Sequence, residues 1–195
     1  MLSVSNAFQE IQKSWVELSG PQFLDETNSL SEKEKNFLQE QIKLRPIDFQ
    51  PRLRGEFFEY GPLDLLLEDL DITEILVNGP KSIWLEKEGK LYRHDDFFFS
   101  EISFNNIIER ICQAVGGHTS LNHPYLESKF LDFRLTLIDA SLSGTFAALS
   151  LRRHPKQVWS LERLMKQNWC TSNAAFLIRN LIQERKNFLV VCETG

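Results

Sequence analysis

The chain has 195 residues, of which 42% are hydrophobic, 25% charged and 11% aromatic, and its formal net charge is −5. This length and composition predict one or two globular domains with a buried core, and they exclude a wholly disordered protein. No run of about 18 apolar residues is present, so we expect no transmembrane helix. The first residues lack the basic and apolar regions of a secretory signal.

Charge is distributed unevenly along the chain. Residues 1–150 hold 14 basic against 24 acidic side chains, whereas residues 151–195 hold 8 against 3. An acidic chain with a short basic part is not typical of a protein that binds nucleic acid, so we expect no such partner. The basic part can face a phosphate ligand or an acidic protein, or it can be a solvated helix face.

The cysteines and histidines do not form a pattern that predicts a metal site. Cys112, Cys170 and Cys192 are odd in number and include no Cys-x-x-Cys pair, which argues against a disulfide framework and a structural zinc site. His118 and His123 have no carboxylate or cysteine at ligand spacing, so we expect loop histidines. A reducing, cytoplasmic compartment is the simplest interpretation.

The first 45 residues are predicted to form a small helical region. Apolar side chains at spacings of three and four favour an amphipathic helix over residues 5–18. Ser31 and Glu34 form a capping-box pattern at the start of a second helix, which Arg45-Pro46 ends. Residues 46–60 are interpreted as a linker whose many aromatic side chains predict that it packs on another part of the chain.

Residues 61–155 read as a second region in which a short leucine-rich helix over 63–70 precedes several strands. A further helix is predicted to begin at Ser103 as its N-cap and to end at Gly116-Gly117. Six segments have the composition and alternation of β-strands: 72–77, 82–86, 91–93, 125–130, 133–138 and 146–152. Pro155 is expected to end the last of them.

The last part of the chain, residues 156–195, predicts helices over 160–167 and 172–186 and then a short apolar strand over 188–191. A strand without polar alternation is typical of a parallel sheet that is buried on both faces. A helix, such a strand and a Gly-containing turn is how a nucleotide-binding α/β domain opens. A phosphate-binding loop needs Gly-x-x-x-x-Gly-Lys-Ser/Thr, however, and only four residues follow the strand.

Several blocks between Gly61 and Gly195 resemble, in order and spacing, the amino-terminal part of the type II/IV secretion and pilus-assembly ATPases. The resemblance is strongest to the Tad/Flp pilus branch. The blocks are Gly61-Pro-Leu-Asp-Leu-Leu-Leu67, Ile72-Thr-Glu-Ile-Leu-Val-Asn-Gly79, Leu149-Ser-Leu-Arg-Arg-His-Pro155, Ser160-Leu-Glu-Arg-Leu164 and Asn187-Phe-Leu-Val-Val-Cys-Glu-Thr-Gly195. They cover about two thirds of the chain, and residues 1–60 lie outside them.

The resemblance implies an α+β protein that is part of a two-domain hexameric motor. Residues 61–155 would be its PAS-like N-terminal domain, preceded by the helical region 1–45 and the linker 46–60. Residues 156–195 would be a linker and the start of a RecA-like ATPase domain. In the family, ATP with Mg²⁺ lies between the two domains, and arginines of the N-terminal domain reach its phosphates.

The family's phosphate-binding arginines match Arg134 and Arg152, with Arg153 as the adjacent candidate. Thr194 and Gly195 would belong to the phosphate loop, in which Cys192 replaces the first glycine. Arginine suits a phosphate because it stays charged and offers a fork of donors. Without the resemblance, Arg134 and Arg152 could simply be strand residues that face solvent.

The lysine and acidic groups of the family mechanism have no match within the 195 residues, so we expect no catalytic residue and no ATP hydrolysis by this chain as it stands. ATP and Mg²⁺ would belong to a longer parent, and neither is expected to bind tightly here. The expected partners are other ATPase subunits and an inner-membrane platform protein. The expected location is therefore cytoplasmic, peripheral to the inner membrane, without direct membrane insertion.

Two other functions are consistent with the residues. The chain could be a stand-alone, non-enzymatic relative that binds or regulates a complete secretion ATPase, because the residues of the catalytic half are missing. It could also be a nucleotide or cyclic-dinucleotide sensor, because its last 45 residues are basic.

Overall fold

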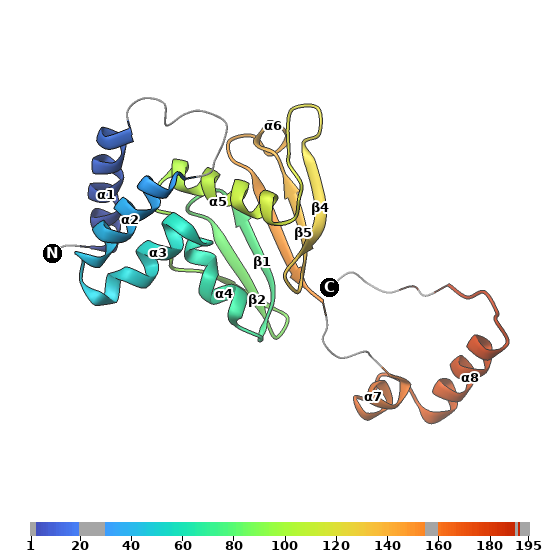
Figure 1. The fold of residues 1–195 in the computed structure, drawn as a ribbon. Coiled ribbons are helices and arrows are strands. Elements are labelled where there is room, and N and C mark those ends of the chain that lie inside the picture. The colour runs from blue at the N-terminus through green and yellow to red at the C-terminus, as the bar shows by residue number, and fades with distance from the viewer. Residues whose placement is uncertain (1–2, 20–29, 155–159, 190, 192–195) are drawn as a thin grey trace. The chain divides into compact units, whose positions relative to one another are not determined.

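The computed structural model describes residues 3–19, 30–154, 160–189 and 191, which belong to two compact units (Figure 1). The first unit comprises residues 1–154 and the second comprises residues 155–195. The first unit therefore joins the helical region, the predicted linker and the predicted strands in one body. This boundary agrees with the end of the strand-rich region 61–155 that was predicted from the sequence.

The N-terminal helices pack around a small apolar cluster of their own. They are α1 (Val4–Ser19), α2 (Glu32–Lys43), the 3₁₀ turn η2 (Ile47–Phe49) and α3 (Gln50–Phe58). The predicted capping box is confirmed, because the Ser31 side chain accepts from the Glu34 N–H and the Glu34 carboxylate accepts from the Ser31 N–H. Residues 47–58 of the predicted linker are helical, and Leu53 and Phe57 from α3 are buried in this cluster. The prediction that this segment packs on another part of the chain is confirmed.

The rest of the first unit is built around a six-stranded antiparallel sheet, which makes the chain α+β as predicted. The 3₁₀ turn η3 (Gly61–Leu63) and helix α4 (Asp64–Glu68) lead into it. The strands are β1 (Ile72–Asn78), β2 (Ile83–Lys87), β3 (Lys90–Arg93), β4 (Tyr125–Phe130), β5 (Phe133–Ile138) and β6 (Ala148–Arg153). Their spatial order is β3-β2-β1-β6-β5-β4, and all neighbours are antiparallel.

Helix α5 (Glu101–Ala114) crosses the sheet, and it begins earlier than the sequence predicted. Its N-cap is Ser100, whose Oγ accepts a hydrogen bond from the Ser103 N–H at 3.0 Å. Ser103 was predicted as the cap but lies buried inside the first turn. Two serines three residues apart can each cap a helix. The Ser103 hydroxyl instead donates to the Glu56 carboxylate, which lies 47 residues away in the sequence.

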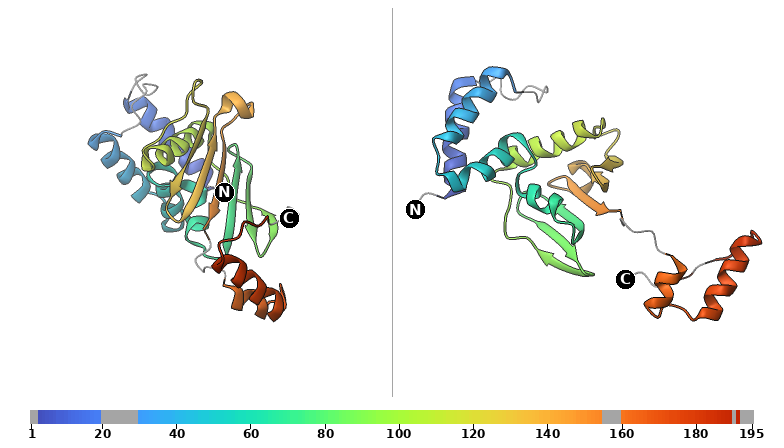
Figure 2. Two further views of the ribbon diagram at one scale, coloured as in Figure 1. Left: turned by 90° about the vertical axis from the view of Figure 1, so that its right-hand side faces the viewer. Right: turned by 60° about the horizontal axis from the view of Figure 1, so that its bottom comes forward.

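The core lies on one face of the sheet, between the strands and the helices α4 and α5 (Figure 2). Alternation along β5 shows why: Phe133, Leu135 and Leu137 are buried in this core, whereas the residues between them point to the opposite face. None of the helices described in the first unit covers that opposite face, which we call the open face. A one-sided core is ordinary for an antiparallel sheet.

The second unit contains two helices among its described residues, α7 (Leu161–Lys166) and α8 (Ser172–Gln183), with Ser160 and Thr171 as N-caps. Both helices were predicted. The predicted strand over 188–191 is wrong for its described residues, because Phe188, Leu189 and Val191 are exposed and not in a strand. A strand of a parallel sheet needs hydrogen-bonded neighbours, and residues 160–189 of this unit provide none.

Three of the predicted features lie outside the described residues: Pro155 as the residue that ends the last strand, the substitution Cys192, and the phosphate-loop residues Thr194 and Gly195. Among the helices that the structure describes, none combines the length and apolar character needed to cross a membrane.

Candidate functional site

The open face brings together the two arginines that the sequence singled out. Arg134 on β5 lies directly opposite Arg152 on β6 in the strand register, and Lys129 on β4 lies opposite Arg134 on its other side. Lys129, Arg134 and Arg152 thus form one row across three strands, which we call the cationic row. On the far side of Arg152, the cross-strand neighbour is Glu74 of β1.

The order of residues along β6 explains why only one of its two consecutive arginines belongs to this row. Side chains alternate between the two faces of a strand. Leu151 is buried in the core, so Arg152 points to the open face and Arg153 points back toward the core. The structure therefore separates Arg153 from the other two candidates.

The guanidinium of Arg153 is held by groups of the first unit, and its side chain is only 6% exposed. It donates to the Ile72 carbonyl at 2.9 Å and to the Leu67 and Asp69 carbonyls at 3.0 Å each. It also pairs with Asp132 and lies over the Phe133 ring, 4.1 Å from the centroid. These contacts give Arg153 a structural role in holding β6 against the segment that joins α4 to β1.

Among the described residues, Arg134 has one ion-pair partner, Glu127 of β4, at 2.8 Å on the open face. Hydrogen bonds from the Tyr125 hydroxyl and from Arg134 lower the pKa of Glu127 below its ordinary value. The same pair raises the pKa of Arg134. Both groups are therefore fully charged near neutral pH, and the pair is exposed enough for an incoming anion to compete with Glu127.

Arg152 is the freer of the two arginines. Its side chain is exposed, and it has no hydrogen-bond or ion-pair partner among the residues that the structure describes. Its acidic neighbour Glu74 instead accepts a hydrogen bond from the Ser150 hydroxyl at 3.0 Å. No described residue occupies the donors of Arg152, so they can serve a ligand.

Two arginines at directly opposite positions on neighbouring strands suit an anion with several oxygens. Like charges that lie directly opposite each other on neighbouring strands destabilise a sheet unless an anion separates them. Phosphate and carboxylate groups fit the fork of an arginine with two parallel hydrogen bonds. The cross-strand position of Arg134 and Arg152 therefore makes the open face a candidate site for a multivalent anion.

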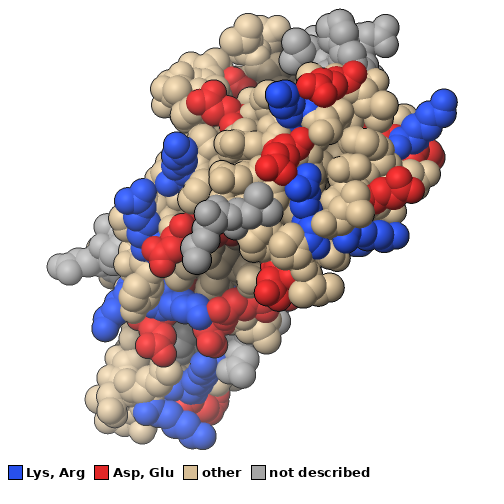
Figure 3. All heavy atoms as spheres, turned by 90° about the vertical axis from the view of Figure 1, so that its left-hand side faces the viewer, with Lys and Arg blue, Asp and Glu red and all other residues tan. Residues whose placement is uncertain are grey.

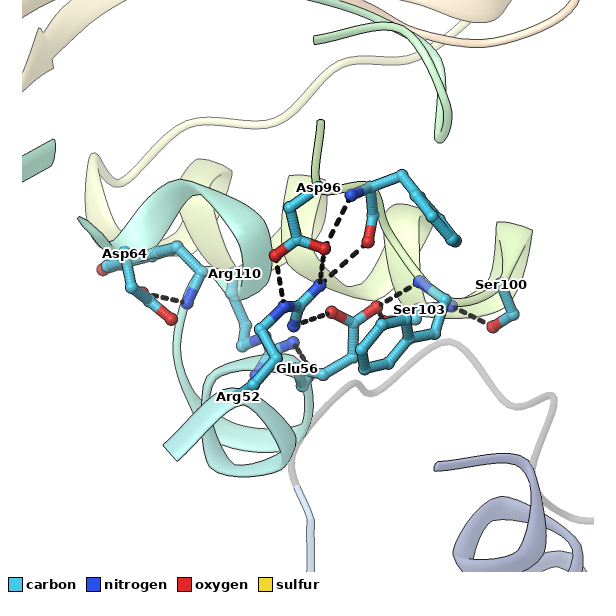
Figure 4. A network of polar contacts seen from close by, with 10 residues as sticks. Arg52, Glu56, Asp64, Asp96, Ser100, Ser103 and Arg110 are labelled. Atoms are coloured by element: carbon cyan, nitrogen blue, oxygen red, sulfur yellow. Dashed lines mark hydrogen bonds and ion pairs between the residues drawn. The ribbon is translucent and has the colours of Figure 1, made fainter. Parts of the chain in front are cut away.

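A second polar cluster, which the sequence analysis missed, lies between α3, α5 and residues 96–99 (Figure 4). At its centre is Glu56, a carboxylate that is 2% exposed. It accepts from the Phe99 N–H at 2.8 Å and from the Ser103 hydroxyl, and it pairs with Arg52 at 2.5 Å. Only the Arg52–Glu56 spacing of four on one helix could have suggested this cluster, and that spacing is common on exposed helices.

Two further arginine contacts extend this cluster across the helical layer. Arg52 pairs with Asp96 at 2.6 Å and donates to the Phe97 carbonyl at 2.8 Å. Arg110 of α5 donates to the Glu56 carbonyl at 2.8 Å, and burial lowers its pKa. The carboxylate of Glu56 is fully used by these protein partners, so we assign the cluster a structural role in joining the N-terminal helices to the sheet.

The side of the molecule that carries the N-terminal helices shows no comparable cationic row. In Figure 3 basic and acidic side chains are interspersed over the described part of this surface. Ion pairs such as Arg45–Glu10 at 2.7 Å account for part of this mixture. The open face is therefore the better candidate for an anion site.

The structure thus defines a chain with a six-stranded antiparallel sheet covered by helices on one face and a pair of arginines on the other. No family model matches the chain. It is 25% identical, over 150 residues, to a protein provisionally named conjugal transfer protein in two strains of Mycobacterium tuberculosis, CDC 1551 / Oshkosh and H37Rv. These matches cover 73% of this chain and 43% of each relative, so the chain spans less than half of their length.

Among solved structures, the chain is similar to the VirB11 ATPase from the Brucella suis type IV secretion system, which was crystallised in complex with sulphate. The two share 18% sequence identity and superpose with a TM-score of 0.47. The superposition covers 63% of this chain and 41% of the ATPase chain.

Proposed function

We propose that this chain is part of an ATPase of a type IV secretion-related system and that its open face supplies Arg134 and Arg152 to the phosphates of ATP. The observation that carries the proposal is the cross-strand pairing of these two arginines. They lie 18 positions apart in the sequence, and each was selected separately by its resemblance to a secretion-ATPase motif. Their adjacency supports a shared ligand.

The relatives found by sequence also support a secretion-related function. Proteins named for conjugal transfer match 150 residues, or 73%, of the chain. In this proposal the sheet serves as the PAS-like N-terminal domain of a Tad/Flp-type motor, and the second unit leads into a RecA-like domain. Thr194 and Gly195 would then belong to the phosphate loop.

In this proposal the two arginines bind phosphate oxygens through their guanidinium N–H donors. ATP bound with Mg²⁺ supplies the phosphoryl group, whose oxygens carry the charge of the transition state. Arg152 has free donors, and Arg134 can exchange Glu127 for a phosphate oxygen, so both fit an anion at the open face. Among the described residues, no group of three or more His, Cys, Asp or Glu could hold a metal ion.

The remaining parts of the proposal concern the assembly. The motor would act as a hexameric ring in the cytoplasm, and its partners would be other subunits of the same ATPase and an inner-membrane platform protein. The basic character of residues 151–195 supports a place for this segment near a phosphate ligand or an acidic protein.

The proposal is tested by the kinetics of ATP hydrolysis in the protein encoded by the complete reading frame. Arg134→Ala and Arg152→Ala are each expected to lower kcat about 100- to 1,000-fold, the effect of removing one donor to a developing charge. Arg93→Ala is the matched control, because Arg93 lies on the distant edge strand β3 and, among the described residues, donates only to the Lys81 carbonyl at 3.5 Å. It is expected to change kcat less than about twofold.

Two results would overturn this proposal. The first is a wild-type protein from the complete reading frame that does not hydrolyse ATP, which would favour a stand-alone binding protein. The second is a pair of arginine variants whose rates equal that of Arg93→Ala.

A further inference from the structure

Strand β4 lies at an edge of the sheet, and its outward backbone groups have no partner among the described residues. The two-residue loop Leu131-Asp132 joins β4 to β5. The Asp139 N–H donates to the Pro124 carbonyl at 2.8 Å, in register with the β4–β5 ladder. Because hydrogen-bonded positions alternate in antiparallel strands, the even-numbered residues of β4 bond to β5. The N–H and C=O groups of Tyr125, Glu127 and Lys129 therefore point outward.

The side chains at these outward positions carry opposite charges two residues apart. Glu127 and Lys129 are both exposed on the open face. An unpaired edge strand is a template for another strand, and charged side chains on it decide which strand is accepted. The edge of β4 is therefore a candidate surface for the addition of a strand.

A second copy of β4 complements this edge in one antiparallel register. When Ser128 faces Ser128 of the other copy, Glu127 of each copy lies opposite Lys129 of the other. Shifting the register by two residues in one direction places Glu127 opposite Glu127, and in the other direction it places Lys129 opposite Lys129. Like charges directly opposite each other are destabilising, so the charges select the first register.

Two further features agree with that register. It joins positions 127 and 129, whose backbone groups both point outward, so these groups can form the hydrogen-bonded pairs of the new ladder. Lys129 lies opposite Arg134 within its own copy, where Glu127 pairs with Arg134 and Lys129 has no ion-pair partner among the described residues. The Glu127 carboxylate of a second copy would lie on the other side of Lys129 and give it an acidic neighbour.

We propose that two copies of this protein associate through β4, antiparallel and with Ser128 on the two-fold axis, to form one continuous sheet. The contact uses the same surface on both copies, so it closes at a dimer. Pairing of a single short strand buries less than the 1,200–2,000 Å² typical of stable interfaces, so we expect a weak, concentration-dependent dimer. This inference does not depend on the ATPase proposal.

The experiment is sedimentation velocity of the 195-residue chain over a concentration series from about 1 μM to 1 mM, a range that covers weak dissociation constants. The expected result is a mass that rises from 22.7 kDa toward that of a dimer. Glu127→Lys and Lys129→Glu each create two like-charge pairs and should raise the dimer Kd about 10- to 100-fold.

The decisive step is to mix the two single variants. One then carries lysine at both positions and the other glutamate at both, so their edges are complementary and a heterodimer should form. The double variant E127K/K129E should also dimerise like the wild type. A variant that has failed to fold would show neither behaviour, which separates loss of the surface from loss of the fold.

Disulfide formation tests the register. Ser128→Cys should form an intermolecular bond between the two 128 positions on mild oxidation, identified by peptide mapping, because directly opposite residues are close enough. Lys129→Cys is the control and should not link to itself. A chain that stays monomeric throughout, a dimer indifferent to the charge reversals, or variants that do not associate when mixed would each overturn the proposal.

Discussion

Replacing Glu56 by alanine is expected to lower the unfolding free energy of the first unit by about 3–5 kcal/mol, the cost of removing one partner of a buried ion pair. The carboxylate is 2% exposed and accepts from the Phe99 N–H and the Ser103 hydroxyl while it pairs with Arg52. Its loss leaves the Phe99 N–H, the Ser103 hydroxyl and one guanidinium nitrogen of Arg52 without this acceptor, while Arg52 keeps its contacts with Asp96 and the Phe97 carbonyl. Each unsatisfied buried group adds to the cost.

Denaturant unfolding of the wild type and two variants measures this effect. Glu59→Ala is the control, because Glu59 pairs with Arg54 at 3.0 Å with both side chains largely exposed, and it should cost less than about 1 kcal/mol. Glu56→Gln keeps the size and one acceptor oxygen and should fall between the two. If the alanine variants at 56 and 59 were equally stable, Glu56 would not be the central residue of the helix–sheet junction.

Arg153→Ala is expected to destabilise the first unit by about 3–4 kcal/mol, whereas Arg152→Ala, one residue earlier, should change stability by less than about 0.5 kcal/mol. Arg153 donates hydrogen bonds to three backbone carbonyls, pairs with Asp132 and lies over the Phe133 ring. Arg152 has no such partner among the described residues.

The same unfolding experiment compares these two variants directly. A larger loss of unfolding free energy in Arg153→Ala than in Arg152→Ala would support the assignment of the two faces of β6. Equal losses, or a larger loss at Arg152, would contradict that assignment. The stability of Arg152→Ala also matters for the kinetic test, because a stable variant that loses ATP hydrolysis has lost a ligand contact and not its fold.

Most of the local structure could be predicted from the sequence because alternation and turn chemistry determine it. The strands over 125–130 and 133–138 match β4 and β5, since apolar and polar residues alternate along 133–138 and a two-residue loop separates the two strands. The capping box at Ser31 is equally local. The predicted strand over 188–191 is wrong for Phe188, Leu189 and Val191, because a strand of this kind depends on neighbouring strands, which a run of apolar residues cannot supply.

The candidate site could be predicted only in part. Arg134 and Arg152 were identified one at a time, and only the register of β5 against β6 shows that they are neighbours. Alternation separates Arg152 from Arg153, but a one-residue shift in register would have exchanged them. The Glu56 cluster could not be predicted from the sequence, because the partners Phe99 and Ser103 lie 43 and 47 residues away from Glu56 along the chain.

Arginine footprinting with phenylglyoxal tests most directly whether the open face contacts a nucleotide. The protein from the complete reading frame would be modified with and without ATP, and each arginine would be followed by mass spectrometry. We expect ATP to protect Arg134 and Arg152, to leave Arg93 reactive, and to have no effect on Arg153, which is buried in both states. Equal modification of Arg134 and Arg152 in the presence and absence of saturating ATP would contradict the proposed role of the open face.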